Sequence, residues 1–353
     1  MNARGTDPVA QDVVDVVGRN RDDFEALRGC RILITGATGF VGSWLLESLL
    51  HAESVCSLGT RITVLTRSPD AFERSSPHLA HHSAIDVVPG DVRHAASVTG
   101  SFDAVIHAAT PANAKLNTDE PLTMIDTVSA GTRAVLELAQ RSGSIPFLFT
   151  SSGAVYGRQP PEMPLVSEEY AGAPDPLEPR NAYHESKRLA ELQCAVYGAM
   201  NAVRPKIARL FAFVGPYLPI DRHFAVGNFI RDALAGRPVV IEGDGTPVRT
   251  YLYAADMTSW LWRIFVRGRE SCAYNLGSEV PRSIAEVAGV VATSVVPVVT
   301  VERRREPSPA DYLPERYACD TLRARSELEL EEWTSFDEAV RRTIVWHRLR
   351  AAP

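Results

Sequence analysis

The sequence predicts an α/β fold built on a doubly wound parallel sheet, with a smaller part contributed by the C-terminal half of the chain. Two observations predict this fold. Short, apolar, β-branched segments alternate with helix-length segments through the first half, and strands spaced in this way indicate βαβ units and a parallel sheet buried on both faces. Beyond residue 203 this rhythm breaks down, so a second, irregular part is expected there.

The predicted sheet takes most of its strands from the first half of the chain. The strands are 31–35, 61–66, 85–88, 104–107 and 146–151, followed by 207–213 and 238–242, and the helices include 43–51, 124–142 and 183–200. We expect residues 1–28 to form a leader and residues 29–203 the sheet domain, with 238–270 returning to the sheet, whereas 204–237 and 271–350 form a smaller substrate-binding part.

The composition narrows the class of protein. The 353 residues carry a formal net charge of −6 and are 45% hydrophobic, which is ordinary for a soluble globular protein. This charge disfavours nucleic acids and membrane surfaces as partners, because they select basic domains. The five cysteines form no close pair, and no apolar stretch reaches the ~20 residues of a membrane span. We therefore expect a cytoplasmic protein. We also expect no metal, since His78, His81 and His82 lack other ligands at metal-binding spacing.

A glycine-rich turn joins the first strand to the first helix. It reads Thr35-Gly-Ala-Thr-Gly-Phe-Val-Gly42, and we expect Gly36, Thr38, Gly39, Phe40, Val41 and Gly42 to contact a dinucleotide. Gly36 allows a tight turn, Gly39 a close approach of a pyrophosphate to the backbone, and Gly42 close packing of the helix on the strand. The helix N-terminus offers free N–H groups to the phosphates. The sheet is therefore expected to be of the Rossmann type.

The end of the second strand bears on which dinucleotide binds. A carboxylate there accepts a hydrogen bond from the adenosine ribose and favours NAD, whereas a cation accommodates a 2′-phosphate. This strand ends without an acid at its tip, and Arg67 suits a phosphate. We therefore expect NADP(H) in preference to NAD(H). Asp91 and Val92, which follow the third strand, are expected at the adenine.

A second motif supplies candidate catalytic side chains. Tyr183 and Lys187 lie four residues apart in a predicted helix, one turn from each other on one face. A neighbouring ammonium stabilises a phenolate, so we expect Lys187 to move the pKa of Tyr183 from about 10 toward neutrality. Ser152 follows a strand at the edge where open parallel sheets bind ligands, and is placed to hydrogen-bond an oxygen that Tyr183 protonates.

Together these motifs resemble the extended short-chain dehydrogenase/reductases that act on nucleotide-sugars, the epimerase/dehydratase group. The resemblance covers about residues 30–350 and rests on the glycine turn, His107-Ala-Ala109, Ser151-Ser152, Val155-Tyr-Gly157, the Tyr183/Lys187 pair, Gly215-Pro216 and Gly243-Asp-Gly245. It implies that Ser152, Tyr183 and Lys187 are catalytic. It also implies that Phe40, Val41, His107, Ala108 and Ala109 line the cofactor cleft.

The resemblance further implies a substrate and an assembly. It places Ser152 and Gly153 at the sugar, and Arg249 and Arg305 at the diphosphate of a nucleotide-diphosphate sugar. A homodimer formed through the helices at about 124–142 and 183–200 is what the family implies.

Departures from the family pattern narrow the reaction. Family dehydratases follow the serine with an Asp–Glu pair, and decarboxylating members keep a glutamate there, but this chain has Gly153 and Ala154, which carry no proton. Elimination and decarboxylation are therefore disfavoured unless another acid, such as Glu185, takes that role. Ala212 stands in place of the family's asparagine before the Gly-Pro turn, so a substrate contact is lost or moved.

We therefore expect an NADP(H)-dependent reductase of a nucleotide-linked 4-keto sugar. The nearest alternative is a nucleotide-sugar 4-epimerase with tightly bound NAD, which uses the same three side chains. A 4,6-dehydratase is a further alternative, which Gly153 and Ala154 disfavour because neither carries a proton. A non-catalytic dinucleotide sensor is another, and it has no need of the Tyr183/Lys187 pair.

Overall fold

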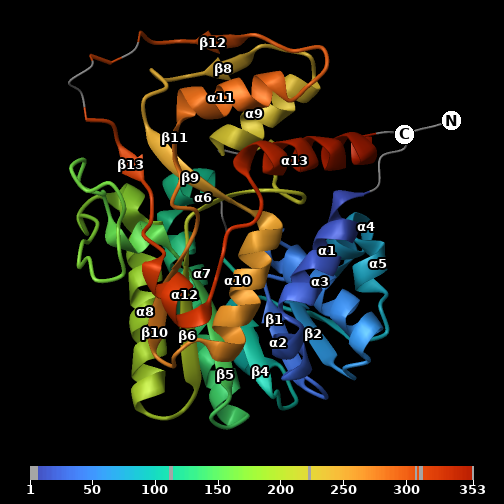
Figure 1. Ribbon diagram of the computed structural model, residues 1–353. Coiled ribbons are helices and arrows are strands. Elements are labelled where there is room, and N and C mark those ends of the chain that lie inside the picture. The colour runs from blue at the N-terminus through green and yellow to red at the C-terminus, as the bar shows by residue number, and fades with distance from the viewer. Residues whose placement is uncertain (1–6, 111–113, 222–223, 307, 310–312, 352–353) are drawn as a thin grey trace, which may run out of the picture.

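The computed structural model describes residues 7–110, 114–221, 224–306, 308–309 and 313–351 (Figure 1). At its centre lies a seven-stranded sheet in the order β10-β6-β5-β4-β1-β2-β3, and every neighbouring pair in it is parallel. The strands are β1 (Arg31–Thr35), β2 (Arg61–Thr66), β3 (Ile85–Pro89), β4 (Ala104–His107), β5 (Pro146–Ser152), β6 (Arg204–Leu210) and β10 (Cys272–Leu276). The predicted doubly wound parallel sheet is confirmed.

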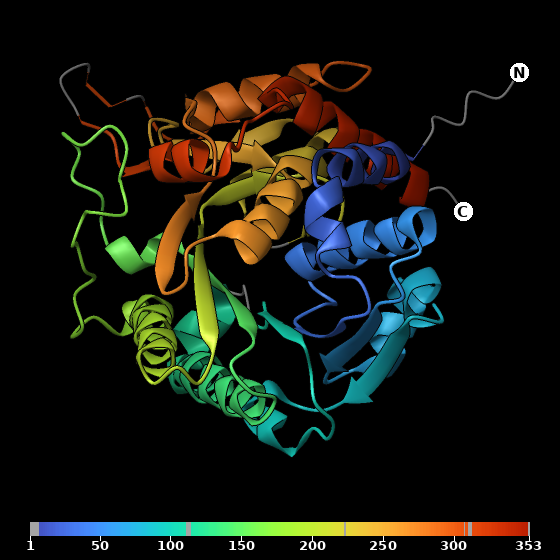
Figure 2. The same cartoon turned by 60° about the horizontal axis from the view of Figure 1, so that its bottom comes forward.

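Two layers of helices cover the sheet, one on each face (Figure 2). Leu33 and Val105 pack toward α7 (Pro121–Arg141) and α8 (Ala182–Ala199). Their chain neighbours Ile32 and Ile34 pack instead toward α3 (Phe40–Cys56) and α10 (Ala254–Arg267). Successive side chains of a strand point to opposite faces, so burial of both faces explains why these strands are apolar throughout.

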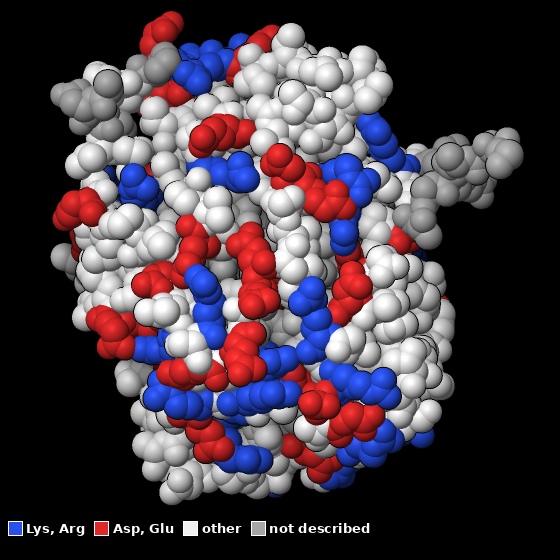
Figure 3. Space-filling model, viewed as in Figure 1, with Lys and Arg blue, Asp and Glu red and all other residues white. Residues whose placement is uncertain are grey.

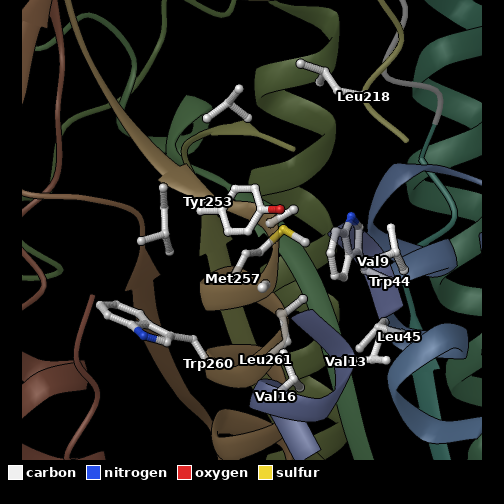
Figure 4. Packing of buried hydrophobic residues seen from close by; sticks show 14 of the residues in the cluster. Val9, Val13, Val16, Trp44, Leu45, Leu218, Tyr253, Met257, Trp260 and Leu261 are labelled. Carbon is white, nitrogen blue, oxygen red and sulfur yellow. The ribbon is translucent and has the colours of Figure 1, made fainter. Parts of the chain in front are cut away.

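The N-terminal segment is part of the α3 and α10 layer. It forms α1 (Pro8–Arg19) and α2 (Arg21–Glu25). Val9, Val13 and Val16 of α1 are buried against α3 and α10 (Figure 4). Asp12 accepts hydrogen bonds from Tyr253 and Arg342, which both belong to the C-terminal half. We expected residues 1–28 to form a leader outside the sheet domain. Residues 7–28 instead complete its core, because the apolar stripe of α1 is covered on one side.

The C-terminal half adds two small sheets above the carboxyl ends of the main strands. In one, β9 (Val248–Tyr253) pairs with β7, β11 and β13, and in the other β8 pairs with β12. The remaining strands are β7 (Ala212–Val214), β8 (Val239–Ile241), β11 (Pro281–Ser283), β12 (Val301–Arg303) and β13 (Arg316–Tyr317). The larger helices here are α9 (Ala225–Leu234), α11 (Ile284–Thr293), α12 (Leu322–Leu328) and α13 (Phe336–Ala351).

Two expectations for this half were wrong in detail. The predicted strand 207–213 is divided between β6 and β7, which belong to different sheets. The segment 238–270 does not return a strand to the main sheet, because β8 and β9 pair within the small sheets and the returning strand is β10. The physical reason is that α10 acts as the crossover, so the strand that follows it pairs in parallel with β6.

Short elements connect these layers: α4 (Pro69–Ser75), α5 (Pro77–Ala80), η1 (Val92–Ser97), α6 (Ala114–Asp119), η2 (Gly153–Tyr156) and η3 (Pro179–Asn181). On the face seen in Figure 3, acidic and basic side chains are interspersed. The described residues form ion pairs such as Arg269–Glu327 and Arg325–Glu279. Among the described helices, none is long and apolar enough to cross a membrane.

Candidate active site

The glycine turn lies between β1 and the N-terminus of α3. Gly36 has a φ of +73°, and a Cβ on it would lie 2.6 Å from the backbone nitrogen of Ala109. A Cβ on Gly42 would lie 2.6 Å from the carbonyl carbon of Ala37. These two glycines therefore let the β4 loop and the first turn of α3 pack on the turn. Thr38 and Gly39 are exposed at its tip, with Phe40 and Val41 half-buried behind them.

Beyond β2 and β3, the predicted adenosine-side residues occupy different environments. Arg67 is exposed directly after β2. Asp91 accepts hydrogen bonds from Arg93, which together lower the pKa of its carboxyl to about 2, although partial burial acts against the shift. The charge of Arg67 contributes further in the same direction, so these side chains are neighbours. Val92 is buried and faces Gly131 of α7, so its side chain belongs to the core.

His107 lies beneath the glycine turn. Its Nδ1 is 2.7 Å from Thr35 Oγ1 and its Nε2 is 3.1 Å from Thr132 Oγ1. Burial, with the nearby charge of Lys187, lowers the pKa of His107 to about 3, so the imidazole is neutral. The ring thus supports the cleft from within the sheet. Ala108 and Ala109, which follow it, are half-buried against the turn.

The structure brings Ser152, Tyr183 and Lys187 together where β5 ends against α8. The Lys187 ammonium lies 6.0 Å from the ring centroid of Tyr183 and donates to Thr110 Oγ1 at 2.8 Å and to the Thr150 carbonyl at 2.6 Å. Burial lowers the pKa of Lys187 to about 7. Buried amines and phenols with perturbed pKa values in one place are typical of proton-transfer sites.

We expected the pKa of Tyr183 to be lowered toward neutrality, but in the described chain this pKa is raised. Burial raises the pKa of the phenol, and the hydrogen bond with Ser152 only partly offsets this. Burial acts on both partners, because a low-dielectric surrounding disfavours the phenolate and the ammonium alike. In addition, Lys187 directs its protons to Thr110 and Thr150, and not to the phenol.

At Gly153, next to Ser152, two aromatic side chains occupy the space that a Cβ would enter. A Cβ there would lie 2.6 Å from Phe211 Cζ and 2.8 Å from the hydroxyl of Tyr317. The rings of Phe211 and Tyr317 pack with their centroids 4.7 Å apart, and the Tyr317 hydroxyl is 3.4 Å from Ser152 Oγ. The acid that is missing from the sequence at Gly153 is therefore replaced in space by two aromatic rings from the C-terminal half.

The two predicted diphosphate-binding arginines lie in different places. Arg249 in β9 is paired across the ladder with Tyr317 in β13, and such partners project from the same face of a sheet. Its guanidinium forms an ion pair with Glu315 at 2.6 Å. Arg305 is exposed just after β12, and within the described chain no contact joins it to Arg249 or Ser152.

Several site residues were missed from the sequence. Phe211, Tyr317 and Thr110 come from distant segments, and no local spacing points to them. Glu191 is different, since it lies four residues after Lys187 and so on the same helix face. It accepts from Ser151 Oγ at 2.5 Å and pairs with Arg209 at 2.7 Å.

The parallel sheet, the glycine turn and the grouping of Ser152, Tyr183 and Lys187 are features expected of a dinucleotide-dependent enzyme. The NAD-dependent epimerase/dehydratase family matches residues 32–277. UDP-glucuronic acid decarboxylase 1 from Xenopus tropicalis is 30% identical over 318 residues, which are 90% of this chain and 72% of that protein. The chain belongs to the NAD-dependent epimerase/dehydratase family, and the predicted resemblance to the extended short-chain dehydrogenase/reductases is confirmed.

Solved structures agree with this assignment. An epimerase from Methanothermobacter thermautotrophicus matches with a TM-score of 0.75 at 25% identity, over 94% of this chain and 97% of that chain. A UDP-glucuronic acid 4-epimerase from Bacillus cereus, in complex with UDP-glucuronic acid and NAD, matches with a TM-score of 0.76 at 21% identity, over 90% of this chain and 99% of that chain. At this lower identity the likeness concerns the fold alone.

Proposed function

We propose that this protein reduces a nucleotide-diphosphate-linked 4-keto sugar with NADP(H). One observation carries the proposal: Ser152, Tyr183 and Lys187 are assembled, whereas Gly153 and Ala154 beside Ser152 carry no acid and two aromatic rings occupy the space at Gly153. In the family pattern, loss of water or of CO2 needs a further acid or base at one or both of these two positions. Reduction of a carbonyl takes a hydride from the cofactor to carbon and a proton to oxygen, and it needs from the protein only the three assembled side chains.

The three side chains divide the work at the carbonyl oxygen. Tyr183 donates its phenolic proton to that oxygen as it becomes an alkoxide. Ser152 donates a hydrogen bond to the same oxygen and stabilises its developing charge. Lys187, when protonated, stabilises the phenolate that Tyr183 leaves behind. These electrostatic contributions are strengthened by burial, because the Lys187 side chain is almost fully enclosed in a low-dielectric surrounding.

The described residues fit a dinucleotide. The exposed tip Thr38-Gly39 lies at the N-terminus of α3, where free N–H groups suit phosphates, and Gly36 and Gly42 keep that turn compact. When bound, the reduced nicotinamide supplies the hydride. Arg67 is exposed where it can pair a 2′-phosphate, and this supports NADP(H). Asp91 is fixed by Arg93 and retains lone pairs for an adenine amino group.

The substrate diphosphate is assigned to Arg249, with Arg305 as a second contact. Arg249 projects from the same face of its sheet as Tyr317, which reaches Ser152. Its partner Glu315 is about half exposed, so a diphosphate can displace that carboxylate and form a bidentate contact with the guanidinium. Binding of the diphosphate therefore exchanges one anion for another at Arg249.

We also propose that two copies associate through α7 and α8. These helices pack on each other and expose Leu122, Leu189, Leu192 and Val196 to solvent. Apolar side chains gathered on adjacent exposed helices are typical of protein interfaces. Cytoplasmic location remains a prediction of the sequence.

The proposal is tested by offering the purified protein 4-keto nucleotide-sugars with NADPH and, separately, with NADH. We expect cofactor oxidation with NADPH, and a product whose C4 carries a hydroxyl. Failure to oxidise NADPH with every 4-keto nucleotide-sugar tried, together with failure of the reverse reaction, would overturn the proposal.

A nucleotide-sugar 4-epimerase is the second candidate, and one observation favours it. The Bacillus cereus epimerase with this fold was solved with NAD bound, and epimerisation uses the same three side chains. The co-purifying cofactor separates the two candidates. Tightly retained NAD supports the epimerase, whereas a cofactor that exchanges freely with added NADPH supports the reductase.

A further inference from the structure

Two successive turns of α8 hold two successive residues of β5. Lys187 donates to the Thr150 carbonyl at 2.6 Å, and Glu191 accepts from the Ser151 hydroxyl at 2.5 Å. The next residue of the strand is Ser152. Side chains of α8 therefore hydrogen-bond to the backbone of Thr150 and to the side chain of Ser151 at the end of β5. These two residues come immediately before Ser152, which contacts the reacting oxygen in the proposed function.

The carboxylate of Glu191 is itself held in place. Arg209 of β6 donates to it from Nε at 3.0 Å and from Nη2 at 2.7 Å, so the pair is bidentate. Arg209 also donates to the Tyr156 hydroxyl at 2.9 Å, and Tyr156 donates to Asn275 in β10 at 2.7 Å. The side chains of Glu191 and Arg209 are only 12% and 16% exposed, so this network is shielded from salt and solvent.

Glu191 is also the charged neighbour of the Lys187 ammonium. The other titratable groups that face Lys187 in the described chain are Tyr183 and Cys194 on α8 and His107 on β4. Burial raises the pKa values of the phenol and the thiol and lowers that of the imidazole, so all three are uncharged near pH 7. Glu191 therefore supplies the negative charge that opposes the burial of Lys187.

We propose that Glu191 is a positioning residue that places a carboxylate one turn of α8 from Lys187 and fixes the end of β5 for Ser152. The role in catalysis rests on the proposed function, whereas the electrostatic role does not. Glu191 acts through Lys187 and Ser151, and touches no reacting atom in this assignment. Arg209 serves by holding the carboxylate within the turn of α8 that follows Lys187.

The composition of the chain makes a direct test possible. The sequence contains three lysines, Lys115, Lys187 and Lys206. Protein labelled with 13C at the lysine Cε carbons therefore gives three signals, which Lys187→Arg and Lys206→Arg variants assign. Lys206 is an internal control, because its ammonium is also buried but donates to the carbonyls of Phe265 and Val266 and lies in another part of the sheet.

The decisive comparison is between Glu191→Gln and Ser151→Ala, each titrated by NMR. Glu191→Gln removes the charge and keeps an acceptor, so we expect the pKa of Lys187 to fall by about 1 unit while that of Lys206 is unchanged. Ser151→Ala removes the hydrogen bond and keeps the charge, so the Lys187 titration stays at the wild-type value. Glu191→Asp retains the charge and should titrate close to wild type.

A double variant guards against loss of folding. Glu191→Gln leaves Arg209 without its partner, which is costly for a buried pair. Glu191→Gln/Arg209→Gln removes both charges, and we again expect the Lys187 titration to move to lower pH. An unchanged Lys187 titration in both Glu191 variants would overturn the proposal, as would an equal shift in Ser151→Ala.

The pH profile of activity connects this result to catalysis. If protonated Lys187 is required, activity is lost as pH rises through its pKa, so Glu191→Gln moves the alkaline limb to lower pH by the NMR shift. Ser151→Ala leaves that limb in place. A shifted NMR titration in a protein without reductase activity would support the electrostatic role and count against the proposed function alone.

Discussion

Glycines on the two sides of the active site make room for different kinds of atoms. On the cofactor side, Gly36 and Gly42 make room for main-chain atoms of Ala37, in the turn itself, and of Ala108 and Ala109, in the loop after β4. On the substrate side, Gly153 makes room for the rings of Phe211 and Tyr317. The first requirement comes from the backbone of the fold. The second comes from particular side chains, so it can change with them and alter the reaction.

The largest expected effect lies on the substrate side. Tyr183→Phe removes the proton donor, so we expect kcat to fall by roughly 10²–10⁴-fold with little change in cofactor affinity. Tyr197→Phe is the matched control, since Tyr197 lies on the same helix α8 outside the Ser152 contact. Steady-state kinetics of both variants check this. Equal activity of Tyr183→Phe and wild type would show that Tyr183 is not the proton donor.

On the cofactor side, the backbone requirement predicts a stability loss. Gly36→Ala should destabilise the fold by about 3 kcal/mol, because its Cβ would overlap the β4 loop and its φ is unfavourable for alanine. Gly29 has the same φ of +73° with no atom within 4 Å of a Cβ, so Gly29→Ala isolates the conformational cost of about 1 kcal/mol. Chemical denaturation measures both. Equal losses would show that packing adds nothing at Gly36.

The need for a glycine at position 153 should be weaker when the neighbouring Phe211 ring is replaced by a smaller side chain. Gly153→Ala is expected to cost about 2 kcal/mol in unfolding free energy, because Cβ meets the Phe211 ring. In a Phe211→Leu background the same substitution should cost less, with a coupling of about 1 kcal/mol. A double-mutant cycle by denaturation measures this coupling. Strict additivity would mean that the ring does not exclude a side chain at this position.

Arg67 provides a smaller test of cofactor selectivity. Arg67→Ser should weaken NADPH binding by roughly 10-fold, since it removes one charge-assisted contact, and should leave NADH binding unchanged. Arg74→Ser, in the neighbouring α4, is a control of equal charge change. Titration of both cofactors checks the result. A parallel loss for NADH would rule out recognition of the 2′-phosphate.

The smallest effect is expected at Asp91, on the stability of the fold. Its folded-state pKa of about 2 is below the ordinary value of 3.8, so its ion pair with Arg93 stabilises the fold above pH 3.8 and this contribution is lost as pH falls toward 2. After allowance for solvent screening, Asp91→Asn should cost about 1 kcal/mol at pH 7. Denaturation of both proteins between neutral and acid pH should show the difference shrinking only at the acid end.

The same contrast explains what the sequence could predict. The glycine turn and the Tyr183/Lys187 pair depend on neighbours within one turn or one helix, so spacing alone located them. Tyr317 of β13 reaches Ser152, and Phe211, between β6 and β7, packs against Gly153. Both lie far along the chain, and pairing between short strands carries no local signal. The same limitation misplaced β8 and β9. The predicted direction of the Tyr183 pKa shift was wrong because residue spacing does not report burial or the competing partners of Lys187.

The most direct measurement follows deuterium from cofactor to product. The wild-type protein is incubated with a 4-keto nucleotide-sugar and NADPH carrying deuterium at the nicotinamide C4, and the product is analysed by mass spectrometry and NMR. We expect one deuterium at the sugar C4 and an otherwise intact sugar. Release of CO2 from UDP-glucuronic acid, or of water from a nucleotide-hexose, with no deuterium transferred, would contradict hydride transfer as the sole chemistry of this site.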